Sequence, residues 1–351
     1  MNKQHYKSTG KKSLFDEQFT SEKLLEIGNP LAMISKVIDF EMFRTTLENK
    51  LLNTNKKNKA GARPYDVVLM FKILILQRYY GLGDKQVEYQ ILDRNSFKTF
   101  LGLETGDKVP DEKTVWAFRE TITKTGLVED LFEHFKNYLA QKELIFNEGQ
   151  LIDASFTVAP RQRNTREENQ KIKDGQGDEL WNDNPHKKRH KDIDAKWTKK
   201  NNETFYGYKN HAKVGNKAKF INKYAVTDAS VHDSQATDDL LDEKDKGQDL
   251  YADSAYTGEE QEKTIAKYEM NNKVHEKGYR NKPLTEEQKK SNTEKSKIRV
   301  RVEHVFGFME QSMNGLKLKS IGIIRATGII GLINLTYNLF RYEQVIRLNI
   351  L

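Results

Sequence analysis

The spacing of hydrophobic residues along this chain changes near residue 148. Before that point, apolar side chains recur every three to four positions, which is typical of helices with one buried face. Residues 66–80 are apolar almost all round and predict a helix that is buried on every side. Residues 61–147 are therefore predicted to form an all-helical domain. Its further helices are expected over 84–94 and 96–103, and from near 110 and 127.

The first 60 residues are predicted to contain a short helical segment followed by a linker. Asn29-Pro30 is typical of a helix start, because proline is accommodated in the first turn. Leu31, Ile34 and Ile38 then follow at helical spacing. The polar stretch 53–64 lacks this pattern and is assigned to the linker.

After residue 148 the apolar period becomes two, which is typical of strands. The predicted fold class for 148–351 is α/β, a mixed five-stranded sheet with helices. Strands are expected over 151–159, 204–214, 219–229, 249–256 and 274–278. Helices are expected from about 235, from a capping box formed by Thr257 and Glu260, from 285 to beyond 309, and over 327–345.

One segment, 160–202, interrupts this pattern and shows little periodicity. Its basic residues are concentrated between 186 and 200, where Lys187, Lys188 and Arg189 are consecutive. Such a cluster can bind the phosphates of a nucleic acid, which attract Lys and Arg regardless of base sequence. A solvated flexible loop explains the same composition, so both interpretations stay open at this point.

The composition favours a polyanionic partner and excludes several other classes. The chain has 59 Lys+Arg against 51 Asp+Glu among 351 residues, a formal net charge of +8. It contains no cysteine, which excludes disulfide scaffolds, Cys-ligated zinc and thiol nucleophiles. No stretch of about 18 residues lacks charge, and the N-terminus shows no signal-peptide pattern. We therefore expect a cytoplasmic protein that does not cross a membrane.

Three acidic residues are candidates for chemistry because of their surroundings. Asp153 and Asp253 each lie in an apolar strand context, where a carboxylate is unfavourable unless it is paired or bound to a cation. Glu303 lies in the basic helix 295–310. Carboxylates from two neighbouring strand ends and a facing helix can bind two Mg²⁺ ions, which promote phosphodiester displacement. A turn, edge or capping role is the more common explanation for a single such Asp, and spacing alone leaves it open.

Five sequence motifs occur in an order that resembles a known family. They are LIDASFTVAPRQRN, GYKNHAKV, VTDASVHDSQ, LYADSAYTGEE and KSKIRVRVEHVFGFME. The chain resembles bacterial insertion-sequence transposases of the Asp-Asp-Glu superfamily, of the IS-five type, from about Tyr65 to Tyr342. The resemblance places the catalytic triad on Asp153, Asp253 and Glu303. It implies a ribonuclease-H-like core with the order three strands, helix, strand, helix, strand, helix.

The resemblance also implies an activity and partners. Such a transposase would use two Mg²⁺ or Mn²⁺ ions, cut DNA at element ends and transfer the resulting 3′-hydroxyl into target DNA. Its partners would be the terminal inverted repeats and the target DNA, bound by a homo-oligomer in a synaptic complex at the nucleoid. Two alternatives stay open: a metal-dependent nuclease on the same core, and a DNA-binding protein with an inactive catalytic domain.

A signature of related families is only half present. The pattern Tyr-x2-Arg-x3-Glu-x6-Lys is matched by Arg299 and Glu303, but Ser296 and Glu310 occupy the Tyr and Lys positions. This difference does not affect the triad. It leaves open which residues contact the terminal nucleotide.

The remaining candidates are predicted DNA contacts in the sheet and the basic helix. Lys209 and His211 share one face of an expected strand, and the resemblance implies that this strand lies beside the active site. A solvated strand face is the alternative explanation for these two. Arg299 and Arg301 belong to the basic run 295–301 and are expected to contact phosphates, although part of that run can be plain surface.

The helical domain offers a less specific candidate. A helix-turn-helix within 84–124 would carry Lys113, Thr114 and Arg119 on its recognition helix. A helical bundle that caps the core or forms a dimer explains the same pattern.

Overall fold

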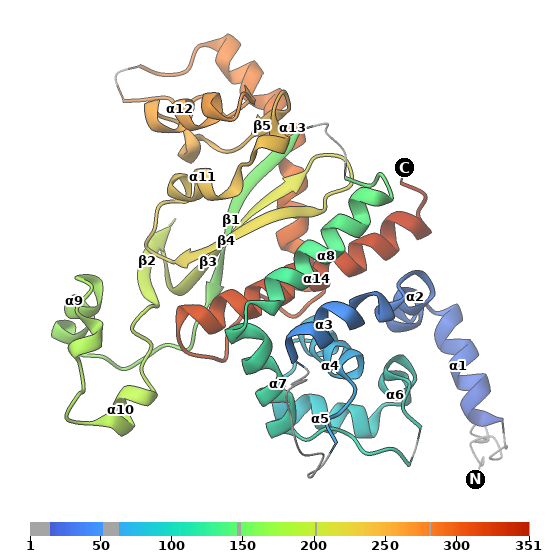
Figure 1. Ribbon diagram of the computed structural model, residues 1–351. Coiled ribbons are helices and arrows are strands. Elements are labelled where there is room, and N and C mark those ends of the chain that lie inside the picture. Colours follow the sequence, from blue (N-terminus) through green and yellow to red (C-terminus); the bar gives the residue numbers. More distant parts are fainter. Residues whose placement is uncertain are drawn as a thin grey trace, which may run out of the picture.

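The computed structural model describes residues 15–51, 63–104, 106–145, 149–200, 202–280 and 282–350. It consists of a sheet, a layer of helices that crosses it, and a small arm (Figure 1). The linker predicted at 53–64 lies almost wholly outside the described residues.

The N-terminal region is helical, as predicted. Asp66 accepts hydrogen bonds from the N–H groups of Val68 and Leu69, which fixes the start of the buried helix. Asp111 caps a later helix in the same way through Thr114. The helices are α1 (Asp16–Glu26), α2 (Pro30–Val37), α3 (Arg44–Leu51), α4 (Val67–Tyr79), α5 (Asp84–Asp93), α6 (Asn95–Leu101), α7 (Glu112–Lys124) and α8 (Leu127–Gln141).

The predicted mixed sheet is confirmed, with one strand more than expected. Its core strands lie in the order β4-β3-β1-β5-β6. The pairs β1–β3 and β3–β4 are antiparallel, whereas β1–β5 and β5–β6 are parallel. The sixth strand, β2, comes from the segment 160–202 and pairs with β3. The strands are β1 (Gln150–Val158), β2 (Lys196–Lys200), β3 (Glu203–Gly215), β4 (Ile221–Asp228), β5 (Asp249–Tyr251) and β6 (Asn271–Asn272).

Several elements after β4 differ in extent from the prediction. The strand expected over 249–256 ends at Tyr251, because Asp253 accepts a hydrogen bond from Ala255 and starts a 3-10 turn. The strand expected over 274–278 lies at β6 instead, although the N–H of His275 still bonds to the carbonyl of Ala252 beside β5. The helix from about 235 is only α11 (Thr237–Leu240), after a 3-10 turn.

The expected Thr257–Glu260 capping box is wrong. The helix α12 (Glu259–Lys267) begins after Gly258, and the hydroxyl of Thr257 donates to the carbonyl of Ser254. The chain order nevertheless remains three core strands, helix, strand, helix, strand, helix, which agrees with a ribonuclease-H-like core.

The segment 160–202 is folded, so the flexible-loop alternative is wrong. It contains α9 (Arg166–Lys173), α10 (Pro185–Arg189) and β2, and forms the arm in Figure 1. Ile172, Leu180 and Trp181 form a small apolar cluster in it. The indole N–H of Trp181 donates to Glu168. Periodicity gave no signal here because each element is too short to repeat a pattern.

Two long helices complete the fold. Thr285 caps α13 (Glu286–Gln311), which begins where the sequence predicted a long helix from about 285. The last helix, α14 (Ile323–Arg347), packs against α4, α7, α8 and β4, so it connects the helical layer to the sheet. Although α14 is long and apolar enough to cross a membrane, 78% of its most apolar window is buried within the protein. It is a core helix, and the side chains of its Asn334 and of Asn210 on β3 hydrogen-bond to each other. The predicted domain boundaries at 60 and 147 stay a prediction.

Candidate active site

Asp153 and Asp253 are brought together by the parallel pairing of β1 and β5. Gln150 is paired with Leu250 and Leu151 with Tyr251, and an aspartate lies two residues further along each segment. The carboxylate of Asp153 accepts from the N–H of Ala154 at 2.8 Å. The carboxylate of Asp253 accepts from the N–H of Ala255 at 2.8 Å. Both aspartates therefore lie at the same edge of the sheet, where β5 ends.

The electrostatics show that the two aspartates act on each other. Burial and, to a smaller extent, the negative charge of Asp253 raise the pKa of Asp153 to about 6. The N–H of Ala154 and the positive charges of Arg299 and Lys200 act in the opposite direction without cancelling the effect. The pair thus carries negative charge that the protein neutralises only in part.

Glu303 reaches this edge from α13, which packs against β1 and β5. Val302 and Val305 are buried and hold the helix in place, while the side chain of Glu303 is about half exposed. Arg299, one turn earlier, bridges the site: its guanidinium lies 3.5 Å from Asp153 and 2.5 Å from Glu303. Within the part of the chain that the structure describes, no three acidic or histidine side chains converge closely enough to hold one metal ion.

Sequence reasoning missed two residues next to the aspartates. The hydroxyl of Tyr256 is buried and has no hydrogen-bond partner among the described residues. Burial raises its pKa, and the charges of Asp153, Asp233 and Asp253 raise it further. The ring of His275 lies 3.3 Å from the hydroxyl of Ser296, and its pKa is lowered by burial, by Arg299 and by Lys295. A signal for Tyr256 was its place in the motif LYADSAY, three residues after Asp253.

Lys209 and His211 are buried in the sheet, so the alternative of a solvated strand face is wrong. In the register of β1 and β3, they are paired with neighbours of Asp153 whose side chains point to the opposite face. The Lys209 ammonium lies 2.7 Å from Asp233 and donates to the carbonyl of Val231. The His211 ring is 2.8 Å from the hydroxyl of Thr227. Burial, with Lys209 adding to it, lowers the pKa of His211 to about 4. A direct DNA contact by either side chain stays a prediction.

The remaining basic residues predicted to contact DNA lie on α13 and on α10 of the arm. Arg301 donates to the backbone and side-chain oxygens of Asn216. Lys187 pairs with Glu168 at 2.7 Å, and Lys188 donates to the carbonyl of Asp178, both within the arm. Arg189 lines a pocket between the arm and the helical layer. Their role in DNA binding is still a prediction.

The structure excludes one of the three residues proposed as DNA contacts on the recognition helix. Arg119 on α7 is buried, and its guanidinium pairs with Asp84 and donates to Gln77. It therefore holds α7 against α5 and is not free to contact a DNA base.

Comparisons with known proteins identify the family of this chain. Residues 146–339 match the family described as "Transposase DDE domain", and residues 19–121 match the family described as "Transposase domain (DUF772)". The chain is also similar to the cryo-EM structure of the piggyBac transposase synaptic complex with hairpin DNA, at 12% identity and a TM-score of 0.44, over 90% of this chain and 74% of that one. Because the first family match spans more than half of its residues, this chain belongs to the DDE transposases, enzymes that act on DNA.

Proposed function

We propose that Asp153, Asp253 and Glu303 are the catalytic carboxylates with which this transposase cuts element ends and joins the 3′-hydroxyl to target DNA. The observation that carries the proposal is the placement of Asp153 beside Asp253 at one sheet edge, facing Glu303 on α13. The raised pKa of Asp153 supports it, because a buried, partly uncompensated pair of acids is typical of a functional site.

Members of this family generally use divalent metal ions, and the donor set fits them. All three side chains offer carboxylate oxygens, the ligands that Mg²⁺ and Mn²⁺ prefer. We infer two ions, which when bound would activate the attacking oxygen and stabilise charge at the phosphorus. Asp153 and Asp253 would hold them first. Glu303 would join them once its bond to Arg299 is exchanged.

The chain's own residues prepare this site for a cation. The Ala154 and Ala255 N–H groups orient one oxygen of each aspartate, which leaves the other oxygen for a ligand. Arg299 supplies positive charge between Asp153 and Glu303, and its guanidinium is also suited to contact a DNA phosphate.

The partners follow from the same proposal. Terminal inverted repeats and target DNA would both reach the sheet edge, and a homo-oligomer would hold two ends in a synaptic complex in the nucleoid. The basic residues of the arm (Lys187, Lys188, Arg189) and of α13 (Arg299, Arg301) are proposed as phosphate contacts. Membership of the IS-five type is part of the proposal.

The experiment compares three single variants with a matched control on α13. Asp153→Asn, Asp253→Asn and Glu303→Gln should each reduce cleavage and strand transfer by more than about 10²-fold, because removing one group that stabilises transition-state charge costs that much. Binding of end DNA should survive. The control is Glu294→Gln, an exposed residue of the same helix that, among the described residues, forms an ion pair with Lys297 alone.

Two outcomes would contradict the proposal. Retention of strand transfer by any of the three variants would show that the carboxylate is not catalytic. If the protein with Mg²⁺ hydrolyses intact element ends but never joins a pre-cut end to target DNA, it is a nuclease on this core and not a transposase.

A further inference from the structure

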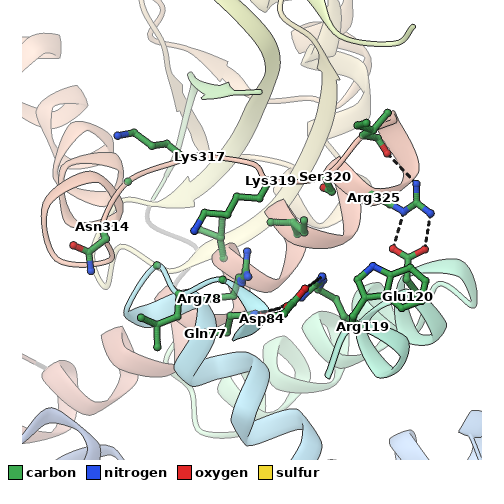
Figure 2. A pocket seen from close by; sticks show the side chains of 18 of the residues that line it. Gln77, Arg78, Asp84, Arg119, Glu120, Asn314, Lys317, Lys319, Ser320 and Arg325 are labelled. Atoms are coloured by element: carbon green, nitrogen blue, oxygen red, sulfur yellow. Dashed lines mark hydrogen bonds and ion pairs between the residues drawn. The ribbon is translucent and has the colours of Figure 1, made fainter. Parts of the chain in front are cut away.

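A second polar cavity lies away from the catalytic carboxylates, between the helical layer and the segment that connects α13 to α14 (Figure 2). It has a volume of about 640 Å³. The α4–α5 turn, α7 and residues 314–325 form its walls. The sequence motifs that carry the triad contain none of its residues. Arg189 of the arm lies at its rim.

The cavity is positively charged after its internal ion pairs are counted. Its two acids are both neutralised: Asp84 bonds to Arg119 at 2.9 Å, and Glu120 bonds to Arg325 at 2.7 and 2.8 Å. Four further cations line the cavity and form no ion pair with any residue that the structure describes. They are Arg78, Arg189, Lys317 and Lys319.

Two buried polar groups in this cavity lack a partner. The Nε of Arg78 and the hydroxyl of Ser320 are both inaccessible to solvent and make no hydrogen bond to a described residue. Burial and the neighbouring charge of Arg119 lower the pKa of Arg78 to about 10. Buried donors of this kind are normally satisfied, so their presence in one cavity indicates an acceptor that is bound from outside.

A second, smaller cavity lies between this cavity and the part of β1 that follows Asp153. This neighbouring cavity of about 540 Å³ shares Asn314, Gly315 and Lys317 with the polar cavity. That neighbour is also lined by Ala154, which directly follows Asp153, and by Lys200, whose charge acts on Asp153. Two lysines, Lys200 and Lys317, and two acids, Glu203 and Glu310, line this neighbouring cavity between β1 and the polar cavity.

We propose that this cavity binds a backbone phosphate of the DNA strand whose reacting phosphate lies at Asp153 and Asp253. The proposal rests on the proposed function, which supplies the DNA. A phosphodiester matches the unneutralised Arg78, Lys317 and Lys319, and it accepts hydrogen bonds as Ser320 requires. The size of the cavity favours part of a polymer over a lone anion, and Trp116 at its rim is 48% exposed, so its ring is available to a sugar or base.

The test measures binding of element-end DNA without divalent ions, so that it does not depend on catalysis. Lys319→Gln should weaken binding about eightfold at 0.1 M salt and make the slope of log K against log[salt] shallower by about 0.9, the effect of one lost phosphate contact. Arg78→Gln should act in the same direction. Because Arg78 is packed in the protein, Lys319, which is exposed, is the variant that is certain to test binding rather than folding.

The matched control is Lys263→Gln, an exposed lysine of α12 on the far side of the sheet (Figure 1). It removes the same charge without touching the cavity. If Lys319→Gln and Lys263→Gln have equal slopes, the cavity does not bind DNA and the proposal is overturned. If inorganic phosphate binds the wild type but not Lys319→Gln while the DNA slopes stay equal, the cavity is a small-anion site, which also overturns it. If the triad variants kept their activity, the proposed function would be wrong, whereas the DNA-binding slopes of Lys319→Gln and Lys263→Gln would not change.

Discussion

Two groups of buried charge on the same sheet have opposite electrostatic arrangements. On β3, Lys213 is 2% exposed, and its ammonium lies 2.9 Å from Asp242 and 2.6 Å from Asp245. At the edge formed by β1 and β5, Asp153 and Asp253 also form an acidic pair, but the nearest cation, Arg299, is 3.5 Å from Asp153 and is shared with Glu303.

The pKa directions reflect this difference. Burial alone would raise the pKa of Asp242, but its hydrogen bond and ion pair with Lys213 outweigh burial and lower it. The pKa of Asp153 is instead raised to about 6 by burial and by Asp253. Asp242 and Asp245 have a cation of the protein, Lys213, in direct contact, so part of their charge is balanced without a ligand. A pair that lacks such a lysine is stabilised by a cation from solution, which is what a metal site requires.

The largest expected effect is on stability and comes from removing the lysine of the neutralised group. Lys213→Met keeps the side-chain volume but leaves Asp242 and Asp245 without their buried partner. We expect a loss of about 3–5 kcal/mol in the free energy of unfolding, measured by urea denaturation. Adding Asp245→Asn to this variant should recover part of the loss. A loss below about 1 kcal/mol would show that Lys213 does not balance the charges of Asp242 and Asp245 in the folded protein.

A smaller effect on the free energy of unfolding is expected when pH changes the charge of Asp153 beside Asp253. The pKa of Asp153 is about 6 in the folded state against an ordinary value of 3.8, so the folded state binds the proton more tightly. The contribution of Asp153 to stability is therefore greatest below pH 4 and declines as pH rises through 6, by on the order of 2–3 kcal/mol. Asp153→Asn should abolish this decline and stabilise the protein at pH 7, as measured by denaturation at several pH values. An unchanged pH profile in the variant would contradict the assignment.

The next largest expected effect is the stabilisation of the folded protein by divalent ions. Mg²⁺ or Mn²⁺ at about ten times its dissociation constant should stabilise the wild type by about 1.4 kcal/mol, because it binds only the folded state. Asp253→Asn should lose this gain, while Lys213→Met should keep it, since Lys213 lies in the other group. Thermal unfolding with and without the ion measures both. An equal gain in all three proteins would place the ion elsewhere.

The sequence predicted the fold well where the pattern is long. The all-round apolar segment is α4, and the long helix expected from 285 to beyond 309 is α13. The arm was missed because its helices span only eight and five residues. The strand expected over 249–256 was too long. The side chain of Asp253 accepts a hydrogen bond from the N–H of Ala255, which starts a turn and ends the pairing with β1.

The candidate site was predictable only in part. Asp153 and Asp253 were visible because a charge in an apolar strand is unusual, and the resemblance added Glu303. Arg299 could be placed on the same helix face as Glu303, but its bond to Asp153 depends on how α13 packs against β1. Lys213 could not be distinguished from a surface lysine, because its partners lie about thirty residues away in the sequence.

The smallest expected effect tests whether burial, rather than the ion pair itself, makes Lys213 important. Lys246 pairs with Glu269 at 2.7 Å, but both side chains are more than 60% exposed. Lys246→Met should change the free energy of unfolding by less than about 0.5 kcal/mol, because water screens an exposed pair and solvates the remaining carboxylate. The same urea titration used for Lys213→Met measures it. If both variants lost equal stability, the cost would come from the loss of any ion pair. The contrast between a closed and an open group of buried charges would then have no physical basis.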